Sequence, residues 1–115
     1  MILEIFNFPD HYKGDTFDSI TFTVKEDGVP VDLTGVAIKM DFRKNSYTGN
    51  LKESKTLGSG LTLVDAINGK FQLDKYINDW DSANYYYDAQ ITFSVLDIRT
   101  YFKGRSTVTQ DSGDE

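Results

Sequence analysis

Residues 85–95 read YYYDAQITFSV, and apolar and polar side chains alternate through this stretch. Because successive side chains of a β-strand point to opposite faces of the sheet, the alternation predicts a strand with one buried and one solvated face. β-Branched and aromatic residues fill the stretch, as is typical of strands. The side chains expected on its buried face are Tyr85, Tyr87, Ala89, Ile91, Phe93 and Val95.

The same alternation occurs at 20–24 (ITFTV) and at 36–43 (VAIKMDFR), so these are the next two predicted strands. Weaker strand patterns occur at 2–6, 51–57 and 101–108. The pattern at 51–57 is interpreted as a short edge strand within a long polar loop. The pattern at 101–108 is expected to pair with 85–95 through a turn near 96–100. A single helical turn is expected within 74–84, with Ile77 and Trp80 packed inward. The predicted core comprises Ile20, Phe22, Val24, Ile38, Met40, Phe42, Tyr87, Ile91 and Phe93.

Turn residues separate these strands. Residues 27–35 read DGVPVDLTG, in which Asp27-Gly28 predicts a tight turn and Pro30 suits an edge or a strand start. Val31 and Leu33 are expected to plug the end of the core. Asn68-Gly69 lies between two further apolar runs and predicts a hairpin over 61–76 with a type I′ turn.

Short strands separated by turns, with no sustained helical pattern, predict an all-β fold, specifically an immunoglobulin-like antiparallel β-sandwich of about seven to nine strands. Asp81, Ala83 and Tyr85 match the Asp-x-Ala-x-Tyr run of such domains, in which the tyrosine hydroxyl bonds back to the backbone. We expect one domain over 1–109 and a flexible acidic C-terminal tail over 110–115.

Composition excludes several functions. The chain has no cysteine, and its 18 acidic residues outnumber its 12 basic ones, which argues against a nucleic-acid partner. The basic residues in the middle of the chain are therefore interpreted as a solvated face. They are Lys39, Arg43, Lys44, Lys52 and Lys55. No stretch has the signature of a secretory signal or a membrane span, so no membrane partner is expected.

Catalytic and metal-binding patterns are also lacking in the sequence. The only imidazole is His11, in a loop, and a lone loop histidine is usually an exposed polar residue. The run DAINGK at 65–70 is the nearest approach to a calcium loop, but it lacks the third-position acid and the closing glutamate. We therefore predict no catalytic residues, no metal, no cofactor and no enzymatic activity.

Exposed aromatic and apolar residues are the remaining candidates for function. Tyr86 is expected on the solvated face of its strand and Tyr47 in the long loop. Ile2, Leu3 and Phe6 belong to an apolar start that is too rich in large side chains for one buried face. We predict that these five residues form an interaction surface, for a protein partner or a glycan, although a β-rich domain leaves some aromatics partly exposed without any function.

Five short motifs follow one another along the chain: G-D-T at 14–16, DGVPVDLTG at 27–35, N-G-K-F at 68–71, Y-x-Y-D-x-Q at 85–90 and G-x-x-x-V-T-x-D at 104–111. This order resembles the small β-sandwich domain at the N-terminus of phage baseplate upper proteins and in related phage and prophage tail or fibre components.

The resemblance implies a non-enzymatic structural role through contacts with other tail or baseplate subunits, or with itself in a weak oligomer. It also implies a virion component assembled in the bacterial cytoplasm. The alternative function is a carbohydrate-binding β-sandwich module, because one fold type serves both roles. A small hydrolase has no support in the sequence.

Removal of metal ions provides the first test. A chelator is expected to leave the melting temperature unchanged within error, because no metal contributes binding free energy to the folded state. Thermal unfolding with and without the chelator measures this. A drop of several degrees would contradict it and would indicate that carboxylates between Asp65 and Asp88 bind calcium.

Overall fold

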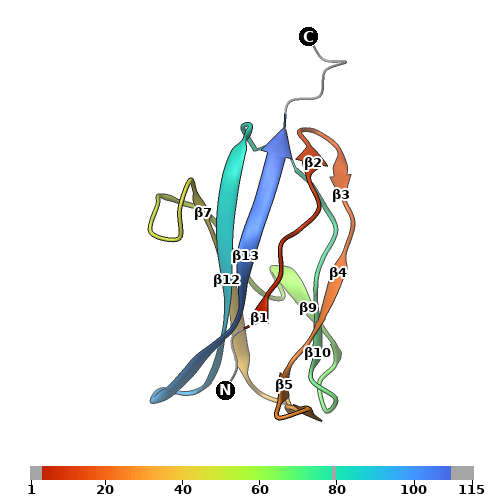
Figure 1. Cartoon of the computed structure of the whole chain (residues 1–115). Coiled ribbons are helices and arrows are strands. Elements are labelled where there is room, and N and C mark those ends of the chain that lie inside the picture. The colour runs from red at the N-terminus through yellow and green to blue at the C-terminus, as the bar shows by residue number, and fades with distance from the viewer. Residues whose placement is uncertain (1–3, 79, 110–115) are drawn as a thin grey trace.

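The computed structural model describes residues 4–78 and 80–109, and within this part of the chain the fold is all-β (Figure 1). The strands are β1 (Glu4–Ile5), β2 (His11–Tyr12), β3 (Thr16–Phe17), β4 (Ile20–Thr23), β5 (Lys25–Glu26), β6 (Val29–Pro30), β7 (Ala37–Lys44), β8 (Leu51–Leu57), β9 (Gly60–Asp65), β10 (Lys70–Leu73), β11 (Tyr76–Ile77), β12 (Ala83–Ser94) and β13 (Asp97–Thr109). No helix that could cross a membrane occurs in the described ranges.

One large sheet runs in the order β1-β13-β12-β7-β8-β9-β10-β4, with β2 also paired to β13. The sheet curls so that β4, β9 and β10 lie opposite β7, β12 and β13, and the core fills the space between them (Figure 1). Phe22 on β4 stacks on Phe71 of β10 at 5.3 Å between ring centroids, and its ring lies 5.1 Å from that of Phe102 on β13. Aromatic contacts therefore join the two layers.

The predicted core is largely confirmed. Fully or nearly fully buried members are Phe22, Val24, Ile38, Met40, Phe42, Tyr87 and Ile91. Ile20 and Phe93 are only partly buried, which corrects the prediction for these two. Phe93 falls where the β12–β13 register shifts between Thr92 and Ser94.

The longest pairing joins β12 to β13, from Ala83↔Val108 to Ser94↔Asp97. The predicted pairing of the last strand with 85–95 is thus confirmed, but the turn is shorter than predicted because β13 begins at Asp97. The prediction that Val95 is buried is wrong. β12 ends at Ser94, so Val95 lies in the turn itself, 91% exposed.

The segment before β12 forms the predicted tyrosine contact, since the Tyr85 hydroxyl donates a hydrogen bond to the Asp81 carbonyl oxygen at 2.7 Å. The predicted helical turn over 74–84 is wrong within the described residues, because β11 instead pairs with β3. Trp80 is buried as predicted. Ile77 is 61% exposed, because it lies on a short strand at the surface rather than on the inner side of a helix.

The connector DGVPVDLTG supplies the turn and second strand, β6, of a hairpin whose first strand is β5. Its turn residues Asp27 and Gly28 both have positive φ, at 52° and 80°. Leu33 is fully buried, which confirms that it plugs the core, and Val31 packs against the core from a partly buried position. The Asp32 carboxylate accepts bonds from the Thr34 amide and hydroxyl at 2.9 and 2.6 Å, which lowers the pKa of Asp32.

The hairpin of β9 and β10 is confirmed, but its predicted turn type is wrong. Only Gly69 has positive φ, at 75°, and its amide donates to the Ala66 carbonyl oxygen at 3.0 Å. The loop is therefore longer than two residues, and a register shift follows it at Lys70/Phe71.

The segment 51–57 is a seven-residue strand that pairs with β7 along most of its length and with β9 only near its end. The interpretation of Lys55 as part of a solvated face is wrong. Its side chain is buried, with Nζ 4.0 Å from the Tyr76 ring centroid and 2.6 Å from Glu53 Oε2. Burial of the lysine is tolerated because the ring and the carboxylate both compensate its charge.

The N-terminal segment runs parallel to β13, first as β1 and then as β2, so the sheet is not wholly antiparallel as predicted; β8 and β9 also pair in parallel. Between β1 and β2, the Phe6 and Phe8 amides donate to the carbonyl oxygens of Lys103 and Arg105 at 2.9 and 2.8 Å. A Cβ atom on Gly104 would overlap the Phe6 carbonyl group, and the Tyr87 hydroxyl donates to the same Phe6 oxygen at 2.7 Å.

Replacement of Gly104 by alanine is therefore expected to lower the free energy of unfolding by about 2–3 kcal/mol, because the methyl group pushes the N-terminal segment away from β13. Gly35→Ala is the control, since Gly35 has a positive φ of 76° but an added Cβ there would meet no atom within 4 Å beyond its chain neighbours, and it should cost about 1 kcal/mol. Chemical denaturation measures both. Only Gly104→Ala should also expose the Phe6 amide to hydrogen exchange, and equal behaviour of the two variants would contradict the steric explanation.

Candidate interaction surface

Five exposed aliphatic side chains lie at or next to the tips of three hairpins. Val95 and Leu96 in the β12–β13 turn are 91% and 95% exposed, and Ile98 just after it is 56% exposed. Val29 on β6 is 64% exposed, and Ile67 in the β9–β10 loop is 71% exposed. Figure 1 shows these hairpin tips at the lower end of the molecule, with β2 and β3 at the opposite end. We call these five residues the apolar end.

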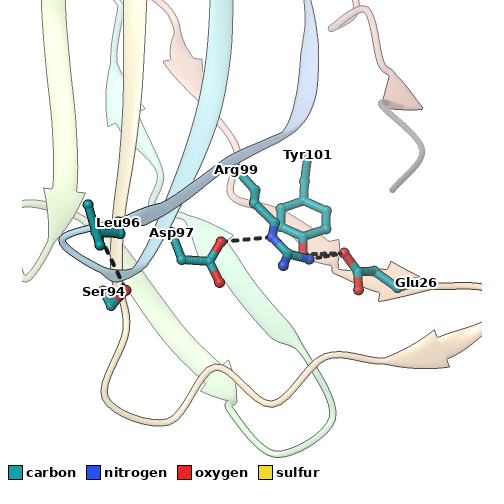
Figure 2. Close-up of polar contacts among 6 residues, drawn as sticks. All are labelled: Glu26, Ser94, Leu96, Asp97, Arg99 and Tyr101. Carbon is teal, nitrogen blue, oxygen red and sulfur yellow. Dashed lines mark hydrogen bonds and ion pairs between the residues drawn. The ribbon is translucent and has the colours of Figure 1, made fainter.

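A polar cluster fixes the β12–β13 tip (Figure 2). Arg99 Nε donates to Asp97 Oδ1 at 2.9 Å, and its Nη1 donates to Glu26 Oε1 at 2.8 Å. The Tyr101 hydroxyl donates to the same Glu26 oxygen at 2.8 Å. Because Glu26 belongs to β5, these bonds link two hairpins that are distant in sequence. Charge-assisted hydrogen bonds therefore help to hold the tip in place.

The charges of this cluster reinforce one another. The hydrogen bond from Tyr101, followed by the contacts with Arg99, holds the pKa of Glu26 below its ordinary value of 4.5. Hydrogen bonds to Asp97 and Glu26 raise the pKa of Arg99, and burial followed by the bond to Glu26 raises the pKa of Tyr101. At neutral pH the carboxylate and the guanidinium are charged, and the neutral tyrosine remains a donor.

The other two tips are joined by backbone bonds. The Val24 amide donates to the Gly69 carbonyl oxygen at 2.7 Å, and the Leu33 amide donates to the Ala66 carbonyl oxygen at 2.8 Å. The β9–β10 loop is thus attached to the residues on either side of the β5–β6 hairpin. Hydrogen bonds therefore connect the β5–β6 hairpin to each of the other two hairpins.

The structure brings two of the predicted site residues together. The Tyr47 and Tyr86 ring centroids are 4.9 Å apart, and Lys103 Nζ lies 5.0 Å from the Tyr47 centroid. Tyr47 is 41% exposed and Tyr86 is half-buried. The two ring planes are inclined by 59°, so they do not form one flat platform of the kind that stacks on a sugar ring.

The predicted N-terminal site residues lie elsewhere. Phe6 is 38% exposed and packs edge-on against Phe8 and Phe22, at 5.5 and 5.9 Å between centroids. Ile2 and Leu3 lie outside the described residues, as does the predicted tail over 110–115.

The sequence prediction missed the apolar end. A signal for it was present in SVLD at 94–97, where two aliphatic residues occupy a hairpin turn that usually contains Gly, Asn, Asp or Ser. This signal was hidden because Val95 also continues the alternation of the preceding strand.

No metal-binding cluster occurs among the described residues, and the imidazole of His11 is bonded to the backbone. His11 Nε2 donates to the Asp15 carbonyl oxygen at 2.9 Å, and its ring lies 5.2 Å from that of Phe17. Within residues 4–78 and 80–109, no three His, Cys, Asp or Glu side chains are grouped closely enough to hold a metal ion. The predictions of no catalysis, no cofactor and no metal remain predictions.

Comparison with known proteins identifies the family. The chain belongs to the BppU N-terminal domain family, the N-terminal domain of phage baseplate upper proteins, whose profile matches residues 11–100. This confirms the resemblance found in the sequence. A search of curated proteins finds no match.

The lowered pKa of Glu26 predicts how the tip responds to acid. A carboxyl group with a depressed folded-state pKa stabilises its contacts above its unfolded pKa, and this contribution disappears as the pH falls through the lower, folded pKa. The Tyr101 ring signal in nuclear magnetic resonance should therefore be constant from pH 7 to 5 and titrate with a midpoint below 4.5. Glu26→Gln should remove this titration, and a midpoint at or above 4.5 would contradict the assigned contacts.

Proposed function

We propose that the chain is a non-enzymatic structural component of a phage or prophage tail, baseplate or fibre, and that it acts through protein–protein contacts made by its apolar end. Family membership supports a baseplate role. The observation that carries the proposed docking surface is the almost complete exposure of Val95 and Leu96 at a hydrogen-bonded hairpin tip.

Exposed aliphatic side chains at a fixed tip favour association for two reasons. Burial of a fully exposed valine or leucine against a partner contributes about 1.5–3 kcal/mol. The bonds of Arg99 and Tyr101 to Glu26 already order the hairpin, so little additional ordering entropy is lost on binding. Large exposed apolar side chains are candidates for burial by a partner, and Val95 and Leu96 are the most exposed of those at this end of the molecule.

We infer an immunoglobulin-like arrangement of the curled sheet, a single domain over 1–109, and incorporation into the virion after synthesis in the bacterial cytoplasm. The partners are other tail or baseplate subunits, or a second copy in a weak oligomer. The formal charge of −6 argues against nucleic acid as a partner.

A carbohydrate-binding module is the second candidate, and the close approach of Tyr47 to Tyr86 beside Lys103 is the observation in its favour. The inclination of the two rings weighs against it. A glycan screen with a hit that is abolished by Tyr86→Ala would favour this function over the structural one.

A charge on the hairpin tip should block assembly without unfolding the chain. The double variant Val95→Asp/Leu96→Asp replaces two exposed side chains, so the free energy of unfolding should change by less than about 1 kcal/mol. Its incorporation into phage particles should fall at least about tenfold, because a carboxylate is costly to bury in an apolar contact. Quantitative blotting of purified particles, together with thermal unfolding of the free chain, measures the two effects.

Ile77→Asp is the matched control. Ile77 is also an exposed aliphatic residue, 61% accessible, but it lies on β11, which pairs with β3 away from the apolar end (Figure 1). This variant should enter particles normally. Equal incorporation of the double variant and the control would show that the apolar end is not a docking surface.

A further inference from the structure

The two ends of the large sheet border a groove. The strand order places β1 at one end and β4 at the other, so within the described chain the sheet does not close on itself. A groove of about 440 Å³ separates them, lined by Glu4 and Phe6 on one side and by residues along β4 and into β5 on the other. Phe22 and Phe102, both nearly buried, contribute apolar surface to it. We call this hollow the edge groove.

The backbone of β4 presents unpaired groups to the edge groove. The Val24 amide donates to the carbonyl oxygen of Gly69, which precedes β10. Backbone N–H groups of successive residues in a strand point to opposite sides, so the Phe22 amide also points toward β10. The N–H and C=O groups of Thr21 and Thr23 consequently point the other way, where the sheet order of the described residues has no further strand. Both threonines line the groove.

This edge lacks the usual protection against strand pairing. Exposed edge strands are commonly blunted by charged side chains, proline or a bulge. β8, which is unpaired on one side over most of its length, carries Lys52, Glu53 and Lys55, and β6 carries Pro30. β4 reads ITFT and has none of these features, and its pairing with β10 is regular. The β4 edge is therefore a suitable template for another strand.

We propose that the edge groove receives an extended segment of a neighbouring subunit, which pairs with β4 as an additional strand. The proposal rests on the proposed function, because it requires a phage assembly that supplies the neighbour. Its backbone would bond to Thr21 and Thr23, and apolar side chains at alternate positions would contact Phe6 and Phe22. An acidic residue of the segment would pair with Lys25, which lines the groove and forms no ion pair within the described residues.

Hydrogen–deuterium exchange, read by fragmentation mass spectrometry, tests this assignment on the unmodified chain. The Thr21 and Thr23 amides should exchange at least tenfold more slowly in purified phage particles than in the dilute free chain. The Phe22 amide is the internal control, since it already faces β10 and should be protected in both samples. The Val95 and Leu96 amides report on the apolar end in the same experiment.

The outcomes separate the two proposals. Slower exchange at Val95 and Leu96 without a change at Thr21 and Thr23 would overturn the edge-groove proposal and leave the proposed function intact. No change at either place would overturn both. Protection of Thr21 and Thr23 in the isolated chain at high concentration would identify a second copy as the occupant, and would overturn the assignment to a different subunit.

A pair of variants tests the role of the backbone. Thr21→Pro removes the outward N–H group while leaving the bonds to β10, and proline is tolerated at such edge positions. Thr21→Val keeps the N–H group and changes only the side chain. Incorporation into particles should fall at least tenfold for the proline variant and remain normal for the valine variant, and equal incorporation would overturn the proposal. Should Thr21→Pro fail to fold, the exchange experiment on the unmodified chain decides.

Discussion

The antiparallel pairing of β12 with β13 is the interaction on which the other parts of the structure depend. β12 also pairs with β7 from Tyr85↔Lys44 to Thr92↔Ala37, and β13 also pairs with β1 and β2. The buried faces of these strands hold several of the large aromatic core side chains, and Tyr85 and Tyr87 are completely buried. One long hairpin thus organises the sheet on both of its sides and supplies much of its core.

The same hairpin connects stability with the proposed function. At one end of β12, the Tyr85 hydroxyl closes the preceding corner, and near its middle Tyr87 and Gly104 together secure the N-terminal segment. At its other end the turn carries Val95 and Leu96 into solvent. A hairpin that is well anchored along its length can expose apolar residues at its tip without collapsing onto them, and this is the property that a docking surface requires.

The apolar end and the edge groove differ in the chemistry they offer a partner. The apolar end offers side chains whose burial is favourable but not directional. The edge groove offers backbone donors and acceptors at Thr21 and Thr23, which fix the direction and register of whatever pairs with them. A subunit that uses both would gain affinity from the first and orientation from the second, as the assembly of a phage particle requires.

Alternation along residues 20–24, 36–43 and 85–95 was enough to predict the main strands, most of the core and the contact of Tyr85 with its own backbone, because all of these follow from local spacing. The family could also be inferred from the order of short turn motifs. Tertiary structure alone decided the rest. Lys55 became buried because a distant ring, Tyr76, covers it, and Val95 became exposed because β12 ends one residue earlier. No local sequence pattern predicts the hydrogen bond between Arg99 and Glu26 or the unpaired edge of β4. Both depend on which strands the curled sheet places side by side.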